Sequence, residues 1–182
     1  MSQIEKIMRQ KKTDSIENIA MYVKQIYGIE TPIHNMDDVV KKLEGELAID
    51  YSKDAYEAYI GRMDLPKDTQ FKIVLRDNSN EEINWLAAVQ LGHLFLDMKY
   101  RINLYEWKNW EDQNTRTLDI HKIHKATIFA SAFLMPADEY KIILLKNQIG
   151  DCVDTASVAK HFNVPIRVAA FRGVKLGLLR AW

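Results

Sequence analysis

The sequence has very little cysteine and no excess of either charge, and each of these features excludes some classes of protein. Among 182 residues there is one cysteine, Cys152, so no disulfide can form within the chain. This suits a reducing compartment, and we expect a cytoplasmic protein. Lys and Arg number 25, as do Asp and Glu, so the whole molecule offers no basic field that would attract nucleic acid. A local basic patch remains compatible with this balance.

Long apolar runs are also missing. No stretch approaches the roughly 18 apolar residues that a membrane-spanning helix needs. The first 12 residues are charged and hold no apolar run, so we expect no secretory signal. Apolar residues make up 47% of the chain and charged residues 27%, which is typical of a globular protein. The length is enough for one domain with a proper core.

Patterns along the chain predict an α+β fold that is mainly helical, with a small three-stranded antiparallel sheet. Apolar residues recur at helical spacing over residues 16–27, and three strand-like segments follow at 46–51, 58–63 and 71–75. Little helix separates these segments, which favours an antiparallel order. Ser79 and Glu82 form a capping box at the start of a helix that should run to about Met98. Apolar residues nearly encircle this helix, so we expect it to be buried and central.

The second half of the chain is predicted to be mostly helical. Residues 100–116 are polar and aromatic and indicate a loop or an irregular insertion, and helices are expected at about 117–134 and 138–145. Two short helices joined by a tight turn are expected within residues 154–172. We therefore divide the chain into a flexible N-terminus, a main domain and a helix-turn-helix-like pair packed on it: residues 1–14, 15–150 and 151–182.

The predicted central helix carries a segment, residues 88–93, that reads AVQLGH. In the HExxH helix of zinc proteases, two histidines four residues apart bind one metal ion from the same helix face. The glutamate that follows the first histidine activates the bound water. In this chain His93 stands at the second histidine position, whereas Val89 occupies the first and Gln90 replaces the glutamate.

Two further segments extend the pattern. Residues 125–136 read KATIFASAFLMP, and residues 154–172 form the predicted helical pair. Together with the first segment they resemble the motifs A-H-E-L-G-H, E-A-x-x-F-A-x-x-L-L-M-P and A-x-x-F-x-V-S-x-x-A-x-x-R of the ImmA/IrrE metallopeptidase family. The resemblance covers about residues 15–180. Each motif is weak alone, but the three in this order and spacing favour the family fold strongly.

The resemblance implies a zinc peptidase that cleaves a helix-turn-helix repressor and so releases genes of a prophage, mobile element or stress response. In such enzymes two histidines and a downstream acidic residue bind zinc, and the motif glutamate is the general base. Carried onto this chain, the ligands are Val89, His93 and Lys125, and the base is Gln90. Valine has no lone pair to donate and lysine is a cation that repels the metal. Glutamine cannot take a proton from water, and losing a general base alone costs about 10²–10⁴-fold in rate.

A zinc site could instead be relocated to different histidines. His121 and His124 lie three residues apart on the helix that would supply the third ligand, so they share a face and could join His93. Against this, His124 precedes position 125 by one residue, which is about 100° around a helix. The simpler interpretation is that His121 and His124 are surface residues and that His93 is a hydrogen-bonded core histidine.

The C-terminal arginines and two tryptophans are candidates for binding. Residues 154–175, with Arg167 and Arg172, could form a helix-turn-helix that reads DNA, although their apolar residues favour packing instead. Trp107 and Trp110 could be exposed anchors for a protein partner, or could fold back over the core.

These observations lead to one main prediction. We expect a catalytically inactive ImmA/IrrE-like pseudopeptidase, with no zinc or other cofactor, that binds a protein partner and regulates transcription. The expected partner is a helix-turn-helix repressor of a prophage or mobile element. The candidate contact residues are Trp107, Trp110, Arg167 and Arg172. Two competing hypotheses are an active zinc peptidase using His93, His121 and His124, and a DNA-binding regulator acting through residues 154–175.

Overall fold

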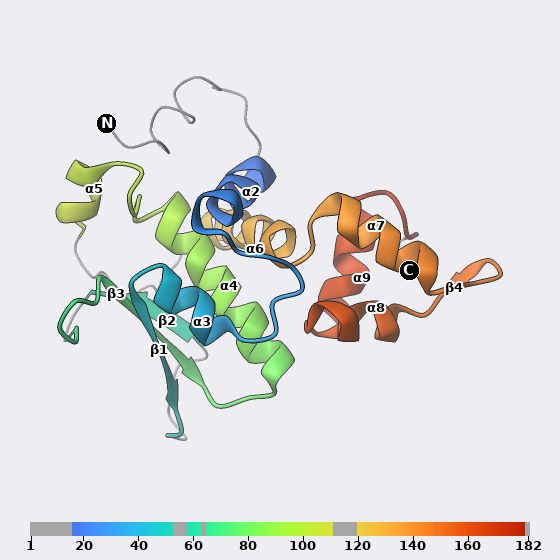
Figure 1. Ribbon diagram of the computed structural model, residues 1–182, viewed down its shortest axis with the longest axis horizontal. Coiled ribbons are helices and arrows are strands. Elements are labelled where there is room, and N and C mark those ends of the chain that lie inside the picture. The colour runs from blue at the N-terminus through green and yellow to red at the C-terminus, as the bar shows by residue number, and fades with distance from the viewer. Residues whose placement is uncertain (1–15, 53–57, 63–64, 111–119, 181–182) are drawn as a thin grey trace.

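A computed structural model describes residues 16–52, 58–62, 65–110 and 120–180 (Figure 1). Three predicted parts lie outside these residues. They are the flexible segment 1–14, residue 63 of the strand segment 58–63, and residues 117–119 of the helix expected at about 117–134. The α+β class is confirmed by the order of elements, which is α2 (Ile16–Tyr27), α3 (Met36–Lys42), β1 (Gly45–Asp50), β2 (Ala58–Gly61), β3 (Phe71–Arg76), α4 (Asn80–Leu96), α5 (Leu104–Lys108), α6 (Ile120–Leu134), α7 (Ala137–Lys146), β4 (Gln148–Ile149), β5 (Cys152–Val153), α8 (Thr155–Phe162) and α9 (Ile166–Lys175). Within the described ranges, no helix is both long and apolar enough to cross a membrane.

The three-stranded sheet is mixed, which corrects the predicted antiparallel arrangement. β3 is the central strand: Leu47 of β1 lies opposite Ile73 in a parallel pairing, and Ile60 of β2 lies opposite the same residue in an antiparallel one. Side chains on both faces of β3 are buried, as Ile73, Val74 and Leu75 illustrate. Alternation within each strand predicts the strand but carries no information on its neighbours, so the order β1-β3-β2 was missed.

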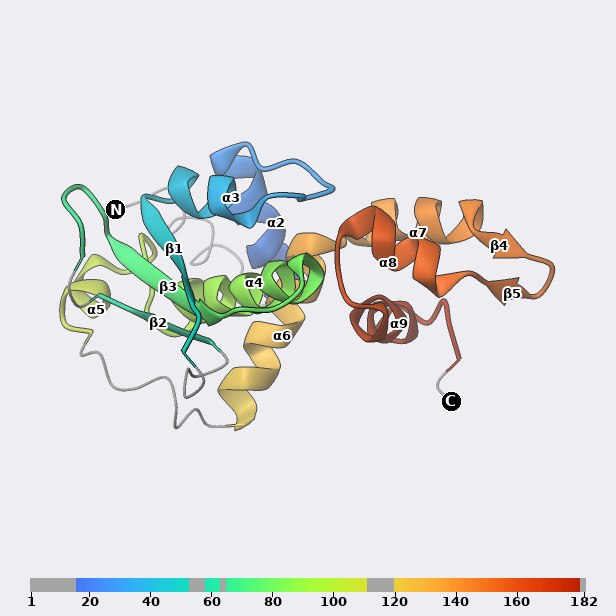
Figure 2. The same cartoon turned by 90° about the horizontal axis from the view of Figure 1, so that it is seen from below.

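The sheet packs on α4, and α4 in turn packs on α6, with α2 covering α6 on another side (Figures 1 and 2). Aromatic side chains join the two central helices. The ring centroids of Phe95 on α4 and Phe129 on α6 are 5.9 Å apart, and Phe133 stacks on Phe129 at 5.6 Å. The predicted central helix is confirmed, because the sheet and α6 cover α4 and most of its residues from Asn84 to Phe95 are buried.

Two buried cations bind carbonyl groups at the end of α6, just before Pro136. The Lys24 ammonium on α2 donates to the Phe133 carbonyl at 3.1 Å, and Arg172 Nε on α9 donates to the Met135 carbonyl at 3.0 Å. The last carbonyls of a helix lack intrahelical donors and carry partial negative charge, so cations there are favourable. These contacts connect α2, α6 and α9 at one point.

The C-terminal helices α7, α8 and α9 form a cluster beside the main body (Figure 2). The Tyr140 hydroxyl on α7 donates to the Ala169 carbonyl at 2.6 Å, and its ring stacks on Phe162 at 6.0 Å. Burial raises the pKa of Tyr140 to about 12, so the phenol keeps its donor proton. The predicted helical pair is confirmed, with Asn163 in the left-handed conformation between α8 and α9 and Pro165 before the second helix.

Two short elements were not predicted. Within the expected insertion, Asn103 Oδ1 accepts hydrogen bonds from the backbone of Tyr105 and Glu106, at 3.1 and 3.2 Å, and so caps the short helix α5. Residues 111–116 of that insertion lie outside the described ranges. The antiparallel pair β4–β5 turns at Gly150, whose φ is +60°. Both elements are shorter than the periodic patterns that sequence reasoning can detect.

Candidate functional site

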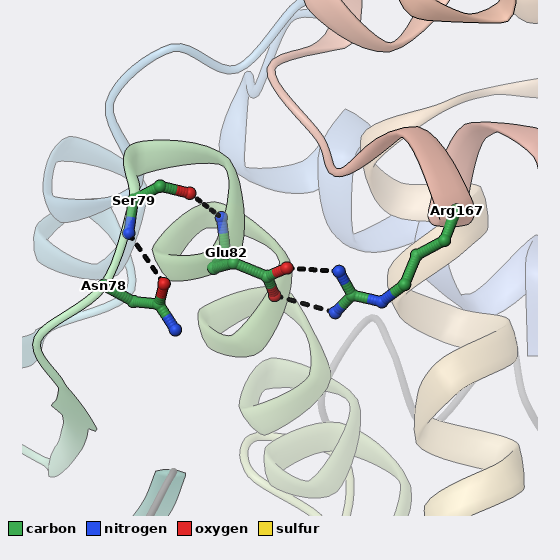
Figure 3. A network of polar contacts seen from close by, with 4 residues as sticks. All are labelled: Asn78, Ser79, Glu82 and Arg167. Carbon is green, nitrogen blue, oxygen red and sulfur yellow. Dashed lines mark hydrogen bonds and ion pairs between the residues drawn. The ribbon is translucent and has the colours of Figure 1, made fainter.

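The start of α4 is fixed by its cap and by a contact with α9 (Figure 3). Ser79 Oγ accepts from the Glu82 backbone N–H at 3.4 Å, which confirms the predicted cap. The other half of the capping box differs, because Asn78 Oδ1 accepts the Ser79 N–H at 2.9 Å. The Glu82 carboxylate is instead engaged by both terminal nitrogens of Arg167, one of them at 2.8 Å. This ion pair links α4 to the C-terminal cluster of α7, α8 and α9.

This ion pair predicts a pH dependence of stability. Hydrogen bonding from Arg167 holds the pKa of Glu82 below its ordinary value. A lowered folded-state pKa means that the stabilisation is present above the ordinary glutamate pKa of about 4.3 and is lost as pH falls through the lowered value. The Arg167 side chain is 61% exposed, so the pair contributes about 1 kcal/mol or less. Urea unfolding at pH 7 should find wild type more stable than Glu82→Gln, and this difference should shrink as the pH falls below the ordinary glutamate value, whereas a difference that acid leaves unchanged would contradict this account.

The motif segment, residues 88–93, lies in the buried middle of α4. Gln90 and His93 are buried, and Val89 is half-buried. Gly92 brings α6 against this stretch, since a Cβ at this position would lie 2.8 Å from both Cα and the carbonyl oxygen of Ala126. The two helix backbones therefore touch at this point.

The close contact predicts an unusual sign for Gly92→Ala. In an exposed helix this substitution stabilises by up to about 1 kcal/mol. Here the new methyl meets the Ala126 backbone, which cannot move as a side-chain end would, and overpacking of this kind costs about 1–3 kcal/mol. Urea unfolding should therefore find Gly92→Ala less stable than wild type. A variant of equal or greater stability would mean that α4 and α6 do not touch at this position.

His93 is held by an acidic neighbour. Its Nδ1 lies 2.7 Å from Asp97 Oδ2, one turn later on the chain, and the side chains are 2% and 12% exposed. Because a carboxylate accepts, Nδ1 carries a proton in this contact. Metal-binding histidines are commonly oriented by a carboxylate in this way. Sequence reasoning missed Asp97, although an acid four residues after His93 is the signal that could have found it.

The remaining motif positions do not fit a zinc ion. Gln90 Oε1 is buried and accepts no hydrogen bond from the described part of the chain, and an amide oxygen cannot take a proton from water as a glutamate would. Lys125 is exposed on α6 and offers an ammonium instead of a carboxylate. Val89 supplies no donor atom. A catalytic zinc usually has three protein ligands, and this set provides only His93.

The relocated three-histidine site is not assembled. His121 and His124 are exposed on α6, whereas His93 is buried on α4. Over the described ranges, no three His, Cys, Asp or Glu side chains gather in a group that could hold a metal ion. The geometry therefore gives no support to a zinc site built from these histidines.

The two tryptophans fold back over the core. Trp107 is 5% exposed, its ring lies edge-on to Tyr100 with centroids 4.9 Å apart, and the Arg62 guanidinium covers it at 4.3 Å. Trp110 is half-buried and packs against the core. The exposure considered for Trp107 is thus corrected, because α5 turns this side chain inward. A partner would meet Trp107 only if this helix moved.

The two candidate arginines of α9 have different surroundings. Arg167 is exposed but engaged by Glu82, whereas Arg172 is 1% exposed. The Arg172 guanidinium donates to Glu17 at 2.8 and 3.1 Å in addition to the Met135 carbonyl. Arg172 is therefore a core residue, which corrects its place among the partner-contact candidates. Both guanidinium groups therefore bind carboxylates of this same chain.

A mixed sheet thus packs on α4, and α6 touches α4 at the motif segment. The family model for the IrrE N-terminal-like domain matches residues 55–173, and the chain belongs to this family. No curated protein matches the chain. Among solved structures, a Mycobacterium tuberculosis transcriptional regulator superposes with a TM-score of 0.54 at 15% identity, covering 93% of this chain and 50% of that one. This likeness shows the fold, and the chain spans half the length of that regulator.

Proposed function

We propose that the chain is a pseudopeptidase that keeps the family fold, has lost hydrolysis and regulates transcription by binding a protein partner. Family membership and the likeness to a transcriptional regulator support a regulatory role. The observation that carries the loss of hydrolysis is the residue at position 125. The contact between Gly92 and Ala126 brings this part of α6 beside the motif helix, and Lys125 offers a cation there.

Three substitutions act together in this proposal. Val89 and Lys125 remove two ligands, and Gln90 removes the base. A single change would leave a weakened site, whereas the joint change leaves only His93, still oriented by Asp97. The scaffold that once positioned the metal is retained, and the donor atoms are not.

The partner that we propose is a helix-turn-helix repressor of a prophage or mobile element, the class of protein that the family resemblance implies as a substrate. Without hydrolysis, the chain acts in the cytoplasm by occupying the repressor or by blocking its oligomer. Residues 151–182 pack on the family domain, residues 15–150, in this proposal. The contacts of Glu82 with Arg167 and of Asn84 with Asn163 support that arrangement.

A repressor encoded in a neighbouring gene is the first partner to test. We expect the two purified proteins to form a stable complex in size-exclusion chromatography with light scattering. After prolonged incubation with zinc, mass spectrometry should find the repressor intact. Repressor fragments that appear with zinc and disappear with a chelator would contradict the loss of hydrolysis, and no complex with the intact repressor would contradict the partner.

A further inference from the structure

The C-terminal cluster of α7, α8 and α9 has an interior of its own. The Tyr140 ring on α7 stacks on Phe162 of α8, and its hydroxyl donates to the Ala169 carbonyl of α9. A Cβ at Gly173 would lie 2.7 Å from the Tyr140 hydroxyl and 2.5 Å from the Leu179 side chain, so α7 and α9 are closely packed. The three helices therefore hold one another in place, and α7 belongs with α8 and α9.

Contact between this cluster and the main body, residues 16–135, is sparse. In the main body α4 and α2 pack on α6 and the strands pack on one another, and in the cluster α8 packs on α7 and α9. Within the described residues, no helix of the cluster packs extensively on a helix or strand of the main body. Figure 2 shows the same division. The chain passes from one part to the other at Met135 and Pro136, between α6 and α7.

Arginine–carboxylate pairs connect the two parts at two places. Arg167 of α9 binds the Glu82 carboxylate in the first turn of α4 with both terminal nitrogens (Figure 3). Arg172, one and a half turns later on α9, binds both oxygens of Glu17 on α2 at 2.8 and 3.1 Å. Both arginines come from the cluster and both carboxylates from the main body. Salt weakens ion pairs of this kind where solvent reaches them.

Neutral and singly charged hydrogen bonds supplement these pairs. Asn84 on α4 donates to the Asn163 carbonyl in the α8–α9 turn at 2.9 Å, and Asn163 Nδ2 donates to the His34 carbonyl at 3.3 Å. The Thr31 hydroxyl donates to the Glu139 carboxylate of α7 at 3.0 Å. Water can replace each of these partners when the two parts separate, so the net contribution of each bond to holding them together is small.

We propose that the C-terminal cluster is a hinged unit, which turns away from the main body about Met135 and Pro136. The two arginine pairs of α9 form the latch that holds it closed. Relative motion is expected of two parts whose interface is neither large nor apolar, and a few residues at the end of an element suffice as a hinge. Opening uncovers Glu17 and Glu82 and leaves the packing within each part intact. This inference goes beyond the proposed function and does not depend on the loss of hydrolysis.

The test measures the distance between the two parts in the full chain. Cys152 is the one cysteine of the sequence and is exposed on β5 of the cluster, so it can carry a spin label. Arg76→Cys places a second label at an exposed site of β3 in the main body. Pulsed electron paramagnetic resonance then gives the distribution of distances between the labels. At low salt we expect one narrow distribution.

Glu17→Gln and Glu82→Gln together should open the latch. Losing the Glu82 carboxylate, whose partner Arg167 is exposed, should raise the ratio of open to closed molecules by up to about fivefold. Losing the Glu17 carboxylate leaves the buried Arg172 guanidinium without its counter-charge and should raise that ratio at least tenfold. A second, longer distance should therefore appear in this latch variant, and high salt should increase its share.

The control is Glu30→Gln with Glu81→Gln, which removes the same charge at two exposed glutamates outside the latch. It should keep the single distance. An unchanged distance in the folded latch variant would overturn the hinge, as would the same second distance in the control. Circular dichroism distinguishes opening from unfolding, and we expect the helix content of wild type in both variants. Helix lost in the latch variant alone would mean that the cluster does not keep its fold when released, which would also overturn the inference.

Discussion

Introducing the three groups that the family resemblance assigns to these positions, as Val89→His, Gln90→Glu and Lys125→Glu together, should give a chain that binds about one zinc ion. Because Gly92 packs on the Ala126 backbone, this part of α6 already lies against the motif helix. His93 is already oriented by Asp97. We therefore expect the helix packing to suit a zinc site once side chains with zinc-binding atoms are introduced. Zinc bound per chain, measured by mass spectrometry of the metal after dialysis, is the readout.

The matched control keeps Lys125 and restores only Val89→His and Gln90→Glu. We expect this double variant to bind zinc far more weakly, because the third ligand is missing and an ammonium takes its place. Both variants should keep the circular dichroism of wild type. A folded triple variant without zinc would show that positions 89, 93 and 125 do not converge. Equal zinc in the double and triple variants would show that position 125 is no ligand position.

Arg172→Met should be the most destabilising of the arginine substitutions, by about 3 kcal/mol. The guanidinium is 1% exposed, donates to the Met135 carbonyl and binds both oxygens of Glu17. Methionine retains much of the side-chain volume but leaves the carbonyl at the end of α6 without its donor, and a buried polar group without a partner is costly. Urea unfolding followed by circular dichroism measures the loss.

Arg167→Met is the control for that experiment. It removes a guanidinium that also binds a carboxylate, that of Glu82, but at a side chain that is 61% exposed. We expect a loss of about 1 kcal/mol or less, since solvent screens the pair and competes for it. Losses of the same size in both variants would contradict the structural distinction between a core arginine and a surface one.

The spacing of apolar residues predicted the helices and strands well, because a buried face requires apolar residues at the period of its helix or strand. The run of apolar residues around α4 predicted a buried central helix, and Ser79 predicted where it begins. Strand order was not predictable in the same way. The pattern of β1 is that of any half-buried strand, and nothing in it specifies a parallel neighbour. Only the nearly continuous apolar run of β3 indicates a central strand.

For the candidate site, too, the sequence predicted the chemical groups but not their packing. Val89, Gln90 and Lys125 are read directly from the sequence, and the resemblance assigned them to the family's ligand and base positions. Which polar groups are buried depends on tertiary packing that the sequence does not display. Arg172 looks like a surface cation in the sequence, yet the ends of α2 and α6 enclose it. Asn84 looks like an ordinary polar residue of α4 in the sequence, yet it is buried and its amide donates to the carbonyls of Ile33 and Asn163.

The zinc content of the wild-type chain tests the central claim most directly. The protein should be purified without chelators, supplied with excess zinc and dialysed, and then measured for metal per chain beside the triple variant. We predict close to zero zinc in wild type and about one in the triple variant. One tightly bound zinc per wild-type chain, together with repressor cleavage that a chelator abolishes, would contradict the proposal that this family member has lost hydrolysis.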